Sequence, residues 1–171
     1  NAKQALKQKL IQSDTNNNLV ETLASKFKLN NSIDLIEVYD NSHIQGTDSI
    51  GALICFGNED FDKKRYRKCN IKNDKVKNDD YGMMKEVLFR RFSKAIKEKS
   101  GSLSLPDLIL IDGGKGQYSV SREILNELGL HDLPILAVAK GKRRNAGEEK
   151  IYYENKEFIL NRNDPLLFFI Q

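Results

Sequence analysis

The chain has 171 residues, of which 39% are hydrophobic, and this is enough to build one core of ordinary size. No apolar run approaches the ~18 residues that a membrane-spanning helix needs, and no basic-then-apolar leader opens the chain, so neither a membrane protein nor a secreted one is predicted. The net charge is only +4, and Cys55 and Cys69 fall in strand-like segments, which favours reduced cysteines in a cytoplasmic protein.

Residues 1–32 predict a helical lead-in to a main domain at residues 33–171. Two short helices are expected, Ala2–Ile11 and Leu19–Phe27, separated by a polar stretch rich in Asn. The abrupt start at Asn1 suggests that the sequence is a piece of a longer protein.

Three strands are expected next, at Ile33–Asp40, Ser49–Phe56 and Lys63–Ile71, with a turn at Gly57–Asp60 between the last two. Because the links between these strands are short, the strands are predicted to pair as antiparallel neighbours.

Beyond the third strand, helices and strands alternate. Helices are expected from Tyr81 to about Lys99 and from about Tyr118 to Leu128, and strands at Leu108–Ile111 and Ile135–Ala139. A strand that reaches its neighbour through a helix pairs with it in parallel, by a right-handed crossover.

The whole succession is the ribonuclease H-like order, an α/β fold with a mixed five-stranded sheet and helices on both faces. Three antiparallel strands come first and a β-α-β-α-β run follows, so that the first and fourth strands lie side by side. The tail is expected to form a small hairpin, Lys150–Tyr153 with Glu157–Leu160, and then a helix that begins at Leu166.

The first and fourth expected strands each end on an acid: Asp40 closes the first, and Asp112 closes the fourth. Carboxylates that converge at the end of two buried strands repel each other unless a divalent cation lies between them, and oxygen ligands suit Mg²⁺ or Mn²⁺. We therefore predict that Asp40 and Asp112 hold a metal ion that serves phosphodiester hydrolysis.

Several polar residues near the two acids have more than one interpretation. Asp80, before the long helix, could be a second ligand or an acceptor behind the ligands, although Asp79–Asp80 is also an ordinary helix start. His43 could act as a general base, but we rank it as a supporting residue, together with Asn41, Ser42 and Gln45. His131 is predicted to be plain surface.

Asp112 is followed by a strand-to-helix turn in which Gly113 and Gly114 could approach a phosphate closely, with Lys115 as a charge beside it. The turn lacks the spacing and the Lys-Ser/Thr pair of a Walker loop. The alternative is that the glycines only supply positive φ after a buried strand.

Basic residues gather on both sides of the expected acidic centre. The segment Lys63–Lys99 contains fourteen Lys or Arg against five acids, and a loop adds Lys140, Lys142, Arg143 and Arg144. Such clusters can hold a nucleic-acid backbone, but Lys-rich helices are more often solvated faces.

The sequence resembles the carboxy-terminal endonuclease domain of UvrC, the incision subunit of bacterial nucleotide excision repair. The matching segments occur in the family's order and are Ile36–Thr47, Tyr66–Lys68, Asp79–Met84, Arg90–Phe92, Pro106–Gln117, Val138–Gly141 and Asp164–Pro165.

This resemblance implies a metal-dependent endonuclease that cuts damaged double-stranded DNA on the 5′ side of the lesion, with UvrB as its partner and UvrA acting upstream. It places the family's metal-binding acids on Asp40 and Asp112 and a further important acid on Asp80. It also suggests that Tyr66 and Arg67 contact the DNA backbone.

One departure from the family pattern is that its site is completed by a histidine that would follow Gln171. The piece shown is therefore expected to be nearly inactive by itself. Two alternatives stay open. The first is a catalytically incomplete DNA-binding or docking module of the same fold. The second is a fragment of an actin-like or sugar-kinase phosphotransferase, in which Asp40 and Gly46–Thr47 would belong to an ATP-binding hairpin.

Overall fold

The computed structural model describes residues 15–29, 32–44, 48–57, 60–61, 66–70, 79–98, 104–140, 149–161 and 163–170. Within them, one mixed sheet has eight strands in the order β3-β2-β1-β5-β6-β7-β8, and β4 also pairs with β2. The ribonuclease H-like prediction is confirmed, because the first and fourth expected strands are neighbours. The expected helix Ala2–Ile11 lies outside the described residues.

The centre of the sheet is the parallel pair of β1 (Leu35–Ile44) and β5 (Leu108–Asp112). Asp107, just before β5, fixes their register: its carboxylate accepts hydrogen bonds from the backbone N–H groups of Asp34 and Leu35, both at 2.9 Å. Leu108, Ile109 and Ile111 are fully buried, as expected for a strand covered on both faces.

The strands on the two sides of this pair differ from expectation in detail. β2 (Asp48–Gly57) pairs antiparallel with β1, and the third expected strand, Lys63–Ile71, is described as β4 (Arg67–Asn70), which pairs with β2. A short strand that was not expected, β3 (Asp60–Phe61), also pairs with β2. The ends of the turn predicted at Gly57–Asp60 pair with each other across β2 and β3, as the first and last residues of a β-turn do, and the two residues between them lie outside the described residues.

On the other side, β6 (Ile135–Ala139) pairs in parallel with β5. The predicted tail hairpin is present as β7 (Lys150–Tyr153) and β8 (Lys156–Ile159). It does not stand apart: β7 pairs antiparallel with β6 and buries Ile151 completely, so the sheet continues beyond the five expected strands.

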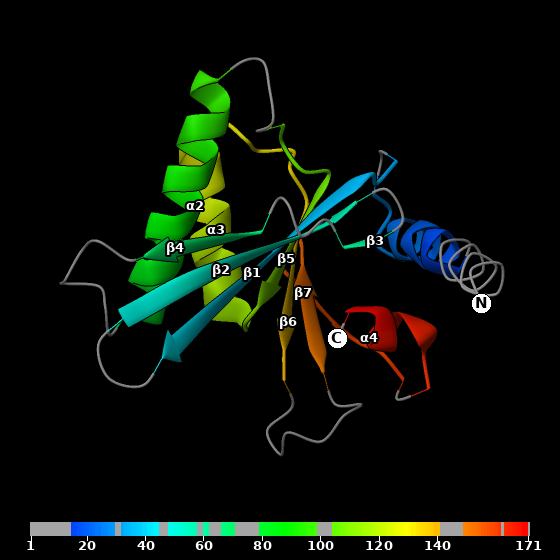
Figure 1. The fold of residues 1–171 in the computed structure, drawn as a ribbon. Helices are drawn as coiled ribbons and strands as arrows, with labels where there is room; N and C mark the ends of the chain where they lie inside the picture. The colour runs from blue at the N-terminus through cyan, green and yellow to red at the C-terminus, as the bar shows by residue number, and fades with distance from the viewer. Residues whose placement is uncertain are drawn as a thin grey trace, which may run out of the picture.

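Helices cover both faces of the sheet (Figure 1). On one face, α2 (Asp80–Lys97) and α3 (Lys115–Glu127) lie side by side, and their apolar stripes form one core with the sheet. On the other face, the helix at residues 15–26 and α4 (Pro165–Ile170) form a second core. Two layers of helix around one sheet are what the predicted fold requires.

The N-terminal helix is longer than expected and belongs to the second core. The chain is already helical at residue 15, the first described residue, which lies inside the polar stretch expected to separate two helices, and the side chains of Thr15, Asn17 and Asn18 are exposed. Val20, Leu23 and Phe27 pack with residues of the sheet and of α4.

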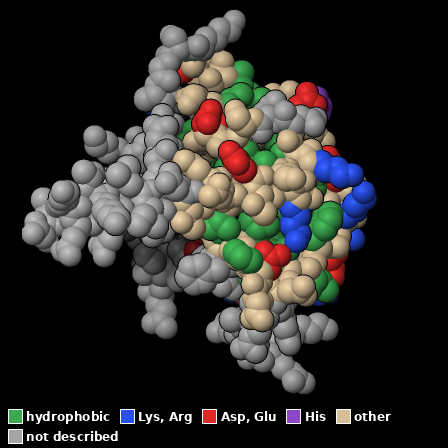
Figure 2. Space-filling model, turned by 90° about the vertical axis from the view of Figure 1, so that its right-hand side faces the viewer, with side chains coloured by type: hydrophobic (Ala, Val, Ile, Leu, Met, Phe, Trp, Pro, Cys, Tyr) green, Lys and Arg blue, Asp and Glu red, His purple; other side chains and the backbone are tan. Residues whose placement is uncertain are grey.

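Figure 2 looks onto the side of the molecule that carries the N-terminal helix and α4. The acidic and basic side chains drawn there are interspersed with hydrophobic and uncharged ones.

In the part of the chain that the structure describes, no helix is both long and apolar enough to cross a membrane.

Candidate functional site

The register of the two central strands brings Asp40 and Asp112 together. Tyr39 and Ile111 are partners across the ladder of β1 and β5, and each acid is the next residue along its strand. Asp112 ends β5 as predicted, but Asp40 does not end β1, which continues to Ile44 through its pairing with β2. Asp40 therefore lies where the parallel ladder ends, not where the strand ends.

Asp40, Asp80 and Asp112 line one small polar pocket of about 220 Å³, together with Met84 and Gln117. Burial and, next in size, the negative charge of Asp112 raise the pKa of Asp40. The three acids singled out from the sequence thus come from β1, α2 and β5 to a single place.

A cation from the chain already lies against this acid pair. Lys140, directly after β6, donates a hydrogen bond from Nζ to Oδ2 of Asp112 at 2.8 Å. Its charge opposes the other two influences on Asp40 and lowers the pKa of that carboxyl. Both side chains of the ion pair are partly exposed, so Lys140 can also reach a bound anion.

The residue that caps α2 is Asp79, and not Asp80. Asp79 has an extended backbone and its carboxylate accepts the N–H of Tyr81 at 3.1 Å, so Asp79 caps α2. Asp80 is the first helical residue and its exposed side chain lines the pocket. The carboxylate of Asp80 is thus not the one that caps the helix.

The donor set fits a hard divalent cation. Among the described residues, no group of three or more His, Cys, Asp or Glu side chains is arranged to hold one metal ion. Mg²⁺ does not require such a group, since it commonly keeps several waters and binds through one or two carboxylates and a substrate phosphate. Asp40 and Asp112, facing an open polar pocket, provide that kind of site.

The glycines in the turn after Asp112 are not explained by positive φ. Of the described glycines, Gly129 alone has positive φ, so the alternative that Gly113 and Gly114 supply it is wrong. A Cβ on Gly113 would lie 2.8 Å from Cγ of Gln117, and a Cβ on Gly116 would lie 2.6 Å from Cζ of Tyr81. Close approach requires these two glycines.

Gln117 is a pocket residue that sequence reasoning did not single out. Its side chain accepts the N–H of Gly114 at 3.2 Å, which lets α3 begin at Lys115, three residues before the expected start. The signal was present in part, because a Gln at the third helical position is one half of a capping box, although Gly114 at the N-cap position has no side chain to form the other half. Met84, also at the pocket, lay hidden in the apolar stripe of α2.

The other residues predicted to support the site or to bind DNA lie in several parts of the structure. Asn41, Ser42 and His43 lie within β1, not in a loop after it, and pair with Gly51, Ile50 and Ser49. Their side chains are not described, and Gln45, Arg143 and Arg144 lie outside the described residues. Lys115 is exposed at the start of α3, and His131 is exposed after it.

Tyr66 and Arg67 lie two strands away from the acids. Arg67 of β4 is the partner of Leu53 in β2, which is in turn the partner of Tyr39 in β1. With about 4.8 Å between neighbouring strands, the backbone of β4 is roughly 10 Å from that of β1.

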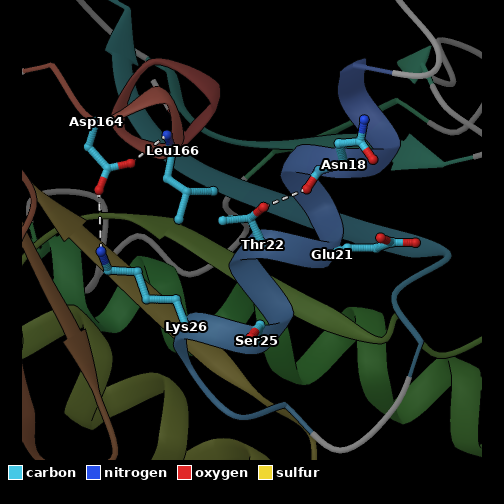
Figure 3. A pocket seen from close by; sticks show the side chains of 7 residues that line it. All are labelled: Asn18, Glu21, Thr22, Ser25, Lys26, Asp164 and Leu166. Carbon is cyan, nitrogen blue, oxygen red and sulfur yellow. Dashed lines mark hydrogen bonds and ion pairs between the residues drawn. The ribbon is translucent and has the colours of Figure 1, made fainter.

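A larger pocket of about 680 Å³ lies between the N-terminal helix and α4, away from the acids (Figure 3). Two carboxylates, Glu21 and Asp164, line it, and Asp164 has both oxygens in use: Oδ2 pairs with Lys26 at 3.2 Å, and Oδ1 accepts the N–H of Leu166 at 2.9 Å. The acids predicted to bind a metal, Asp40 and Asp112, therefore line the smaller of these two pockets.

The strand order and the pair of acids at the end of the β1–β5 ladder define a ribonuclease H-like domain. The family model described as the UvrC RNAse H endonuclease domain matches residues 24–171, and the chain belongs to this family.

Named relatives agree with this assignment. The chain is 47% identical over 175 residues to UvrABC system protein C of Cereibacter sphaeroides and 45% identical to that of Jannaschia sp., with all of the chain covered. It spans 28% of the length of each of these relatives. A crystal structure of human ENDOV is similar with a TM-score of 0.44 and 16% identity, over 64% of this chain and 46% of that one.

Membership of this family supports the prediction of a DNA-repair endonuclease domain and favours it over the phosphotransferase alternative.

Proposed function

We propose that this domain hydrolyses phosphodiester bonds of DNA in a reaction that requires Mg²⁺ or Mn²⁺. The observation that carries the proposal is the acid pair Asp40 and Asp112, coupled by charge in one pocket with Asp80. The bound cation would supply Lewis-acid chemistry, offsetting charge on the phosphate and activating water.

The chain's own residues would have separate roles in this reaction. Asp40 and Asp112 would each offer a carboxylate oxygen to the cation, and Asp80 would be either a second ligand or an acceptor behind the ligands. Lys140 donates a hydrogen bond to one oxygen of Asp112 and would also pair with the phosphate that is cut. Asn41, Ser42, His43 and Gln45 would support the loop and strand around Asp40.

We also propose that the basic and glycine-containing segments near the pocket bind the DNA backbone. Lys115 and the turn at Gly113 and Gly114 directly follow Asp112, so a strand bound at the acids would pass close to them. Tyr66, Arg67, Arg143 and Arg144 would extend this contact. The contact would be electrostatic and independent of base sequence.

At the level of the whole protein, the relatives' name, UvrABC system protein C, supports incision of damaged double-stranded DNA. We propose the 5′ incision, UvrB as the direct partner with UvrA upstream, and a cytoplasmic location.

The experiment is incision of a labelled, damaged DNA duplex by the full-length protein with its partners and Mn²⁺. Asp40→Asn and Asp112→Asn should each abolish incision. Asp132→Asn, which changes an exposed aspartate in the loop after α3, should not. Incision at the normal rate by either site variant would contradict the proposal.

A further inference from the structure

Arg91 of α2 and Glu37 of β1 form a buried ion pair on the face of the sheet that α2 covers. Arg91 donates from Nη2 to Oε1 of Glu37 at 2.6 Å and from Nε to the same oxygen at 3.2 Å. The side chain of Glu37 is 2% exposed and that of Arg91 10%. Desolvation offsets much of the attraction in such a pair, so stability alone explains its presence poorly.

The same two side chains reach all three elements that carry the pocket acids. The hydroxyl of Tyr39, the residue before Asp40, donates to Oε2 of Glu37 at 2.6 Å. Nη2 of Arg91 also donates to the backbone oxygen of Ser104 at 2.9 Å, in the segment that leads into β5. One guanidinium thus joins α2 to β1 and to the entry of β5.

The network is directional, whereas the rest of the α2 packing against the sheet is not. The buried residues of α2 apart from this contact are apolar. Apolar packing opposes separation but resists sliding and rotation weakly, whereas the planar fork of Arg fixes both direction and distance. Arg91 lies eleven residues from Asp80, or about 16 Å along the helix, so a small rotation at Arg91 turns the whole helix and carries Asp80 with it.

We propose that Arg91 is a positioning residue: through Glu37 and Ser104 it sets the place of Asp80 relative to Asp40 and Asp112. This rests on the proposed function, in which Asp80 assists the reaction of the metal-bearing pair. Arg91 itself contacts neither metal nor DNA, because it is buried among β1, α2 and the segment at Ser104.

The test is a double-mutant cycle between Arg91→Lys and Asp80→Asn in the full-length protein, with kcat for incision and the Mn²⁺ dissociation constant as readouts. Lys keeps the charge but not the fork. Arg91→Lys should lower kcat by about 10-fold to 100-fold, with the KM for DNA unchanged, because small misplacements of catalytic groups have costs of that size. In the Asp80→Asn background it should cause no further loss.

Arg90→Lys is the matched control. Arg90 is the adjacent residue on α2, pairs with Glu86 at 3.3 Å and is more exposed, so its change should leave kcat and metal binding unaltered. Circular dichroism should confirm that each variant is folded at the assay temperature.

The outcomes are distinct. An equal loss from Arg91→Lys in both backgrounds, no loss in either, or an Asp80→Asn protein as fast as the wild type would each overturn the inference. If Arg91→Lys does not fold, Glu37→Gln, which keeps the shape and removes the charge, decides in the same cycle. Normal incision by Asp40→Asn would instead refute the proposed function.

Discussion

Asp40 and Asp112 each follow directly after residues that are partners across the parallel ladder of β1 and β5, so their carboxylates share one pocket. Burial and the charge of Asp112 raise the pKa of Asp40, and Lys140 lowers it. Because Asp112 and Lys140 shift the pKa of Asp40 in opposite directions, titration of Asp40 in variants of these two residues tests the arrangement without DNA.

The first prediction concerns the pKa of Asp40 itself. In the metal-free chain, Asp112→Asn should lower this pKa towards 3.8, because it removes a neighbouring negative charge, and Lys140→Ala should raise it. Carboxyl carbon shifts followed by NMR against pH give the midpoint directly. Shifts in the same direction in both variants would show that the groups do not lie around Asp40 as described.

The second prediction concerns stability. Folding raises the pKa of Asp40, so the native state favours the protonated carboxyl. Below the unfolded pKa this group costs the native state no stability, and it destabilises the native state as the pH rises through the folded pKa. At neutral pH, Asp40→Asn should therefore raise the melting temperature of the metal-free chain. Asp132→Asn, at an exposed site, should leave it unchanged. A fall in melting temperature for Asp40→Asn would be the opposite of what the pocket requires.

Much of this arrangement could be predicted from the sequence, because the signals are local. The apolar run at Leu108–Ile111 followed by an acid, and the helical periodicity of Tyr81–Lys99, gave the order of the central strands. The extension of β1 past Asp40 could not be predicted, since Asn41, Ser42 and His43 carry no strand pattern and are held in place by β2.

The parts that failed depend on residues far apart in the chain. The hairpin of β7 and β8 was expected, but its pairing with β6 is a tertiary contact that no local sequence pattern in either segment indicates. The ion pair between Glu37 and Arg91 could not be predicted, because the two residues are fifty-four positions apart in the chain. Gly116 is required by Tyr81, which also lies far from it in sequence.

The third prediction tests that glycine. Gly116→Ala should destabilise the chain by about 1 kcal/mol, the low end of the cost of a forced side-chain shift, because the new methyl group meets the side chain of Tyr81, which is 48% exposed and must turn outward. Tyr81→Ala is the control background: there, Gly116→Ala should be neutral or stabilising, since Ala favours a helix by about 1 kcal/mol. Urea unfolding of the four proteins measures both values. An equal loss in the two backgrounds would exclude the contact as the cause.

The fourth prediction concerns the boundary expected between a lead-in at residues 1–32 and the main domain. Leu23 is fully buried in the core shared by the sheet and α4. Leu23→Ala should therefore destabilise the whole domain by about 2–5 kcal/mol in a single cooperative transition. Ser25→Ala, at an exposed position of the same helix, should change stability by less than about 0.5 kcal/mol. A small effect for Leu23→Ala would mean that the helix is a separate appendage.

The central claim, that Asp40 and Asp112 hold one divalent cation, is tested most directly by calorimetric titration with Mn²⁺. The wild-type chain should bind one ion. Asp40→Asn and Asp112→Asn should each weaken binding by more than the ~10–100-fold lost when an outer partner of a metal ligand is changed. Asp132→Asn should bind as the wild type does. Unchanged Mn²⁺ affinity in both site variants, with the fold intact, would contradict the account.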